Sequence, residues 1–234
     1  MFAFTIRRII QAILVMLVIS FIGFAVQYSI GDPVRDMVGI RVSAAEREAL
    51  REKLGLNDSF WIQYSRFVRN ATRGDLGTSY FYSKPALQVI LQKAPATLEL
   101  VFVTAMIIVL VSLPVGIYTA INPKKLFSKI TMGISTVGVS FPVFLTAIGL
   151  IYLFAVELHW LPSYGRGATV NIGGWETGFL TKDGLLHLIL PSIALSSIML
   201  PLFIRLIRAE MMEVLETEYI KYAWAKGLSR RRVW

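Results

Sequence analysis

The chain contains four apolar runs without Asp, Glu, Lys or Arg: residues 9–30, 100–121, 130–156 and 185–204. An α-helix needs roughly 20 apolar residues to cross the hydrocarbon core of a bilayer, and each run reaches that length. A water-soluble domain would place polar residues among these positions, because its surface must remain hydrated. The runs therefore predict an all-α integral membrane protein with four spans in this chain.

The segments between the runs differ in charge. Arg7 and Arg8 precede the first run, lysines lie between the second and third runs (residues 122–129), and several basic residues follow the fourth run. The segment between the third and fourth runs, residues 157–184, has few basic residues. Since Lys and Arg accumulate in cytoplasmic loops, we expect both chain ends in the cytoplasm. This topology accounts for the net charge of +9, so no nucleic-acid partner is expected.

The runs divide the chain into four parts. Residues 1–30 contain the cytoplasmic N-terminus and first span, residues 31–99 an extracytoplasmic segment, residues 100–208 spans two to four, and residues 209–234 a cytoplasmic segment. Basic residues in 31–99 do not oppose this topology, because segments longer than about 60 residues translocate largely regardless of charge. The first run exceeds the roughly 7–15 residues of a signal-peptide core and lacks a small-residue cleavage pattern, so it is expected to remain.

The extracytoplasmic segment contains three expected helices. The stretch from Ser43 to Glu46 resembles a capping box, which predicts a helix over residues 44–54. Apolar residues recur on one face of residues 60–71 and predict an amphipathic helix. Residues 87–91 are expected to form a short helix at the membrane edge. This segment either binds a partner or shields the spans, and periodicity alone does not distinguish the two.

Glycine and proline interrupt the apolar runs. Examples are Gly116 in the second run, Pro142 in the third, and Pro191 and Pro201 in the fourth. Small residues let membrane helices approach closely, and proline releases backbone carbonyl groups. Both properties suit a transport pathway, although Gly and Pro are common in membrane helices generally.

Recognisable catalytic motifs are missing from the sequence. It has no phosphate-binding glycine loop followed by Lys, no His-Glu-x-x-His pattern, no Gly-x-Ser-x-Gly pattern and no cysteine. The two histidines, His159 and His187, are expected at the outer membrane interface. Glu99, Arg205 and Arg208 lie at span ends, where their charged groups are expected to reach water. We therefore expect no catalytic site, metal, cofactor or proton relay, and any transport would take its energy from elsewhere.

The fourth span is expected to continue beyond the membrane as a charged helix. A second short helix over residues 218–226 should end at Gly227, because glycine adopts the left-handed conformation without cost. Small Ala223 and Ala225 stand among aromatic residues and form a compact knob suited to a partner's groove. A basic helix lying on anionic lipid is the alternative for this segment.

Residues 219–229 read Tyr-Ile-Lys-Tyr-Ala-Trp-Ala-Lys-Gly-Leu-Ser. This segment resembles the cytoplasmic loop of bacterial ABC importer permeases of the dipeptide, oligopeptide and nickel group, typically Tyr-x-Arg-Thr-Ala-Arg-Ala-Lys-Gly-Leu-Ser. Lys221 keeps the usual basic residue, whereas Tyr222 is less usual. Further stretches match in order over nearly the whole chain: Gly-Asp-Pro-Val at 31–34, Gly-Asp-Leu-Gly-Thr-Ser at 74–79, Pro-x-Thr-Leu at 95–98, Trp-Leu-Pro at 160–162 and His-Leu-x-Leu-Pro at 187–191.

The resemblance implies a type I ABC importer permease-like helical bundle in the bacterial inner membrane. Complete members have six spans, so a chain that stops at Trp234 is expected to be a fragment. The implied partners are a second homologous permease, two ATPase subunits that bind ATP and Mg²⁺, an extracytoplasmic solute-binding protein and membrane lipid. The implied coupling helix, which contacts the ATPase, comprises Glu218, Tyr219, Lys221, Tyr222, Ala223, Ala225, Lys226, Gly227, Leu228 and Ser229.

Two other functions remain open at this point. A membrane-anchored scaffold would bind a partner through its outer segment and transport nothing. An ion-driven carrier is less consistent with the sequence, because such carriers place ionisable residues inside their spans and these runs have none. The sequence does not specify the solute, which could be a dipeptide, a longer peptide, a glutathione-like compound or a nickel chelate.

Overall fold

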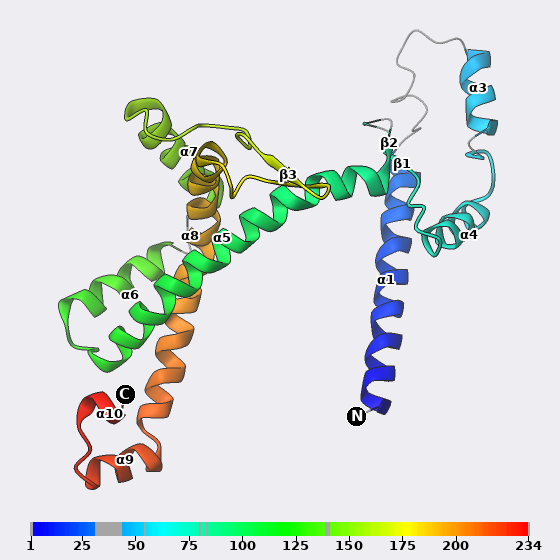
Figure 1. The fold of residues 1–234 in the computed structure, drawn as a ribbon. Coiled ribbons are helices and arrows are strands. Elements are labelled where there is room, and N and C mark those ends of the chain that lie inside the picture. Colours follow the sequence, from blue (N-terminus) through cyan, green and yellow to red (C-terminus); the bar gives the residue numbers. More distant parts are fainter. Residues whose placement is uncertain are drawn as a thin grey trace. The chain divides into compact units, whose positions relative to one another are not determined.

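The structure is a computed structural model and describes residues 2–30, 44–53, 55–79, 81–82, 84–138 and 141–233. It forms two compact units, Met1–Lys93 and Ala94–Trp234, and the boundary between them falls inside helix α5 (Figure 1). The predicted capping box lies outside the described residues, because it includes Ser43.

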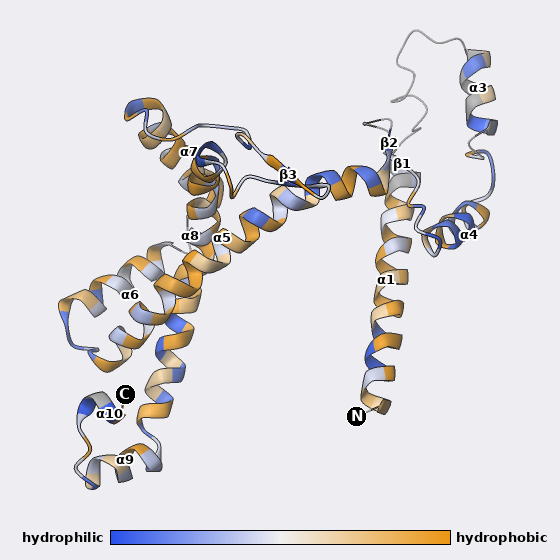
Figure 2. Ribbon diagram, in the orientation of Figure 1, coloured by the Kyte–Doolittle hydropathy of each residue, from blue (hydrophilic) through white to orange (hydrophobic). Residues whose placement is uncertain are grey.

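The first unit contains helices α1 (Phe2–Ile30), α3 (Ala44–Lys53) and α4 (Phe60–Ala71), followed by the hairpin of β1 (Thr78–Ser79) and β2 (Lys84–Pro85). The bounds of α4 confirm the predicted amphipathic helix. The helix expected over residues 44–54 is confirmed up to residue 53, and Gly55 follows it with a φ of 66°. Figure 2 shows mostly hydrophobic residues on α1 and more hydrophilic residues on α4.

The apolar face of α4 packs against α1. The ring centroids of Phe21 and Phe60 are 5.5 Å apart in an edge-to-face arrangement, and those of Phe24 and Tyr64 are 5.7 Å apart. The Tyr64 hydroxyl also donates a hydrogen bond to the Leu17 carbonyl oxygen at 3.0 Å. Aromatic pairs of this kind contribute about 0.5–1.5 kcal/mol each beyond the area that they bury. Within this unit, the amphipathic face therefore shields part of the first span.

The second unit consists of the greater part of α5 and the elements that follow it. In order these are α5 (Ala86–Ile121), α6 (Leu126–Gly138), α7 (Val143–Ile151), the π-helix η1 (Tyr152–Glu157), β3 (Val170–Ile172), β4 (Trp175–Thr177), α8 (Lys182–Leu215), α9 (Glu218–Ala225) and α10 (Arg230–Val233). The prediction of a separate short helix over residues 87–91 is wrong, because these residues form the first turns of α5. The helix continues through Pro95, as membrane helices can when neighbouring groups satisfy the released carbonyl.

Three helices in the described part of the chain are long and apolar enough to cross a membrane: α1, α5 and α8. A fourth span results if α6 and the helix from Val143 to Glu157 count as one bent span. The third apolar run therefore does not form one straight helix. Pro142 stands at the N-cap of α7 with a φ of −61° and a ψ of 135°, and the two helices are bent by 107°. Because proline has no backbone N–H to continue a preceding helix, α7 begins as a new helix after Pro142.

A small residue of α5, Gly116, contacts α8. It is buried, as are the small residues Ser112 and Ala120 four positions before and after it. A Cβ atom added to Gly116 would lie 2.7 Å from the Cγ2 atom of Ile207 and 3.2 Å from the Ile204 carbonyl oxygen. The structure thus confirms that Gly116 permits close helix approach, as small residues do in membrane bundles.

The variant Gly116→Ala is expected to destabilise the protein by about 1–3 kcal/mol, because the added methyl group overpacks the contact with Ile207. Gly133→Ala is the matched control, since nothing lies within 4 Å of a Cβ atom built at that helical glycine. Thermal unfolding of both variants in detergent measures the difference. Equal midpoints for the two variants would contradict the described α5–α8 contact.

Candidate functional site: the two ends of helix α8

Helix α8 is continuous over 34 residues, from Lys182 to Leu215. At a rise of about 1.5 Å per residue its length is about 51 Å, which exceeds the thickness of the hydrocarbon core. The N-cap Thr181 accepts a hydrogen bond from the Gly184 amide at 3.0 Å. The structure therefore confirms that the fourth span extends well beyond its apolar run, through Pro191 and Pro201, as one helix.

Helix α9 follows α8 after a turn at Glu216 and Thr217 (Figure 1). Its bounds, Glu218–Ala225, confirm the predicted second short helix. Ile220 is its one buried residue and is 7% exposed. On the same helix Tyr219 and Tyr222 are 61% and 62% exposed. The helix thus buries one aliphatic side chain and exposes two tyrosine rings.

The structure brings all ten predicted coupling residues together on α9 and the turn after it. Lys221 forms an ion pair with Glu218 at 2.8 Å between Nζ and Oε1. The Nζ atom of Lys226 lies 4.6 Å from the centroid of the Tyr222 ring, within cation–π range. Ala223 is half-buried. The remaining predicted residues are exposed, namely Ala225, Gly227, Leu228 and Ser229.

The end of α9 is a Schellman motif. The Gly227 amide donates to the Trp224 carbonyl oxygen at 2.9 Å, and the Leu228 amide donates to that of Ala223 at 3.3 Å. Gly227 has a φ of 74°, in the left-handed region that glycine adopts without steric cost. The predicted role of Gly227 as the helix stop is therefore confirmed.

Glu99 is buried, and the expectation that its charge reaches water is wrong. Its side chain is 3% exposed, and Oε1 accepts a hydrogen bond from the Gly178 amide at 3.0 Å. Oε2 lies 3.5 Å from Nη2 of Arg166. The loop between η1 and α8, residues 158–181, folds back onto the N-terminal part of α5 and covers the carboxylate. Sequence reasoning missed this contact because its partners are 67 and 79 positions away.

The same loop is bonded to the beginning of α8. The Ala168 amide donates to Oδ2 of Asp183 at 2.7 Å, and the Thr181 hydroxyl donates to the Ala168 carbonyl oxygen. Gly167 has a φ of 74°, and a Cβ atom there would lie 2.6 Å from Nδ1 of His187. His187 lies beneath the loop, and its Nδ1 atom is 2.8 Å from the Asp183 carbonyl oxygen. The loop of residues 158–181 thus contacts both α5 and α8 through polar groups.

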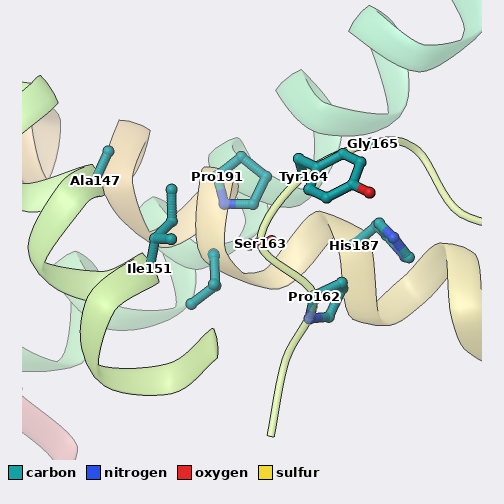
Figure 3. Close-up of a pocket in the computed structure, with 9 residues that line it drawn as sticks. Ala147, Ile151, Pro162, Ser163, Tyr164, Gly165, His187 and Pro191 are labelled. Atoms are coloured by element: carbon teal, nitrogen blue, oxygen red, sulfur yellow. The ribbon is translucent and has the colours of Figure 1, made fainter. Parts of the chain in front are cut away.

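A cavity of about 220 Å³ lies beneath this loop. Figure 3 shows the segment from Pro162 to Gly165 passing along α8 beside Pro191 and His187. Ala147 and Ile151 of α7 complete its wall. The lining is mainly apolar, so the cavity matches packing between the loop and the helices more closely than a site for a charged ligand.

Two family descriptions match the chain. Residues 112–234 match the binding-protein-dependent transport system inner membrane component, and residues 1–101 match the N-terminal part of such membrane components. These matches confirm the resemblance inferred from the motif around residues 219–229.

Individual relatives agree with the family match. The chain is 33% identical to the dipeptide transport system permease protein DppB of Alkalihalophilus pseudofirmus, over 97% of this chain and 72% of the relative. It is 35% identical to the oligopeptide transport system permease protein AppB of Bacillus subtilis, over 100% of this chain and 72% of the relative. It is 33% identical to DppB of Escherichia coli, over 100% of this chain and 74% of the relative. The chain therefore belongs to the family of binding-protein-dependent transport system inner membrane components, the permease subunits of ABC transporters.

Proposed function

We propose that this permease forms half of the path by which an ATP-driven importer moves peptides, or a related small solute, across the bacterial inner membrane. In this proposal α9 is the coupling helix that receives the movement of an ATPase subunit. The observation that carries the proposal is the form of α9: a short helix with exposed tyrosines, a defined stop at Gly227 and a direct connection to α8. The peptide class rests on the names of the relatives.

The energy for transport comes from partner subunits. Permeases of this family have no ATPase site or cofactor of their own, and nucleotide is bound by the ATPase components. We further propose a complex with a second homologous permease, two ATPase subunits and one extracytoplasmic binding protein. Family membership argues against the scaffold and against the ion-driven carrier.

The shape of α9 supports docking against a protein rather than lying on lipid. A helix that lies on a membrane presents one continuous apolar face between basic residues. On α9 the aliphatic Ile220 is buried, and the cation of Lys226 lies over the exposed Tyr222 ring. The exposed side therefore presents the aromatic rings of Tyr219 and Tyr222, a residue type enriched in protein interfaces. The half-buried Ala223 leaves room for a partner's side chain to approach the helix closely.

Uptake in proteoliposomes tests the proposed function. The complete complex with its binding protein is expected to accumulate a radiolabelled dipeptide with ATP and to stop with a non-hydrolysable ATP analogue. A labelled tripeptide and glutathione in parallel define the solute class. Accumulation driven by a proton gradient without ATP would instead support a carrier.

The chain orientation is tested by single cysteines, because the native sequence has none. We expect Lys182→Cys to react with a membrane-impermeant maleimide in intact spheroplasts, and Lys124→Cys to react only after lysis. Both lysines are exposed. The two variants therefore differ in the side of the membrane on which the thiol is predicted to lie, and not in the exposure of the position. The opposite labelling pattern would reverse the proposed topology and remove α9 from the cytoplasm.

A further inference from the structure

Glu99 and Arg166 form a buried polar contact that the coupling helix does not explain. Each oxygen of the Glu99 carboxylate has a different partner: the Gly178 amide for Oε1 and the Arg166 guanidinium for Oε2. Arg166 also donates to the carbonyl oxygen of Glu176 and lies 3.5 Å from its carboxylate. A carboxylate in a membrane protein is costly to bury unless such partners hold it. We call Glu99, Arg166 and Gly178 the outer latch.

The outer latch joins two helices that also meet elsewhere. Glu99 belongs to α5, while Gly178 precedes the N-cap of α8 by three residues. Farther along both helices, Gly116 of α5 contacts Ile207 of α8. The outer ends of α5 and α8 are thus connected by polar groups of the loop, and a second contact follows close to the cytoplasmic end of α8.

Helix α8 connects the latch to α9 without interruption. It begins four residues after Gly178 and ends three residues before α9. A displacement of α9 therefore reaches the loop of residues 158–181 through one helix. We call this loop the outer loop, after the topology proposed above. The latch is the contact at the opposite end of α8. A displacement of α9 would therefore place this contact under strain.

The Arg166 side chain is not fully satisfied in this arrangement. Its Nε atom is buried and has no hydrogen-bond partner within the described residues. The ion pair with Glu99 is long, at 3.5 Å, and the Arg166 side chain is 26% exposed. A buried donor without a partner favours any alternative state in which it finds one. The contact is therefore suited to opening and closing rather than to permanent fastening.

We infer that Glu99 and Arg166 are positioning residues that hold the outer loop across α5 and α8 in the resting permease, and that the ATPase stroke works against this latch through α8. The inference rests on the proposed function of α9. A latch that opposes the stroke disfavours the conformation that the ATPase subunits must reach, so it also restrains ATP hydrolysis when no binding protein is docked. Weakening the latch lowers that restraint.

The test measures ATP hydrolysis by the purified complete complex, with and without its binding protein and a dipeptide. The double variant Glu99→Gln, Arg166→Gln removes both charges together, so that no unpaired charge remains buried. It is expected to raise hydrolysis without binding protein at least about fivefold, the lower end of typical allosteric couplings. The ratio of hydrolysis with binding protein to hydrolysis without it should fall, because the rate without binding protein rises. Arg166→Lys keeps the charge and should give an intermediate rate.

Glu176→Gln is the matched control. It removes a carboxylate that also contacts Arg166, but its side chain is 58% exposed and its backbone carbonyl oxygen still accepts from Arg166. Its hydrolysis rate without binding protein should equal that of the unmodified complex. An unchanged rate in the assembled double variant overturns the latch. Should the double variant fail to assemble, the rate of ATP hydrolysis by Arg166→Lys without binding protein decides the question, and an unchanged rate again overturns the latch.

Failure of the latch is distinguishable from failure of the proposed function. If Ala223→Glu in α9 abolishes uptake while the latch variants hydrolyse ATP like the unmodified complex, only the latch is wrong. If Ala223→Glu leaves uptake normal, the coupling role of α9 is wrong, whatever the latch variants show.

Discussion

Ala223→Glu is expected to reduce solute uptake at least tenfold while the permease still inserts into the membrane. Ala223 is half-buried in α9 and its carbonyl oxygen belongs to the Schellman motif. A new carboxylate at this position would be desolvated without a partner when an ATPase subunit docks. Such an unpaired interfacial charge costs about 2–5 kcal/mol, and each 1.4 kcal/mol corresponds to roughly a tenfold change in affinity. Uptake by the complete transporter and the yield of co-purified ATPase measure the effect.

Gly227→Val should produce the same loss through backbone geometry instead of charge. At a φ of 74° a residue other than glycine costs roughly 1–2 kcal/mol, and a β-branched residue is worse. Because nothing lies within 4 Å of a Cβ atom there, the effect arises from φ and not from a clash. Ala209→Glu on the exposed face of α8 is the control for added charge. Normal uptake by both Ala223→Glu and Gly227→Val would contradict the assignment of α9.

Gly184→Val is expected to destabilise the N-terminal end of α8 by about 3 kcal/mol, the upper end of typical overpacking effects. A Cβ atom at Gly184 would lie 2.5 Å from the Gly178 carbonyl oxygen and 2.7 Å from the Thr181 hydroxyl oxygen. The backbone around Gly184 must therefore move, and this movement disturbs the N-cap hydrogen bond between the Gly184 amide and Thr181. Because Gly178 also donates to Glu99, the outer loop should separate from α5 as well.

Limited proteolysis of the loop between residues 158 and 181, together with thermal unfolding, detects this loosening. Gly133→Val serves as the control, since it adds the same side chain to a helical glycine with open space around it. A lower unfolding midpoint and faster loop cleavage are expected for Gly184→Val alone. Equal behaviour of the two variants would show that the outer loop does not pack on α8 as described.

Elements with strong local signals could be predicted from the sequence. The apolar period of residues 60–71 specified α4 and the face that contacts α1, and the turn at Gly227 specified the end of α9. Both depend on residues within a few positions of one another, where propensity and periodicity act directly. The position of α9, the proposed coupling helix, could be predicted in the same way, helped by its likeness to a known motif.

Features that depend on distant partners could not be predicted. The burial of Glu99 requires the amide of Gly178 and the side chain of Arg166, and no local pattern signals either contact. The hairpin of β3 and β4 forms by pairing within the loop before α8, where no sequence pattern predicts strands. The bend in the third run lies beside Pro142, whereas the charge-free length of the run does not distinguish a straight span from a bent one. An isolated acid before an apolar run, paired with a lone arginine between two glycines, is the signal that would have pointed to the outer loop.

Cross-linking from position 223 tests the central claim most directly, namely that α9 docks onto a separate ATPase. In this cysteine-free chain, Ala223→Cys places a single thiol on α9. With a short bifunctional maleimide–photoreactive reagent, the assembled transporter should give a cross-linked product between the permease and an ATPase subunit. Ala209→Cys on α8 should give much less of it. A thiol at position 223 that never cross-links to the ATPase, or that reacts from outside the cell, would contradict the account.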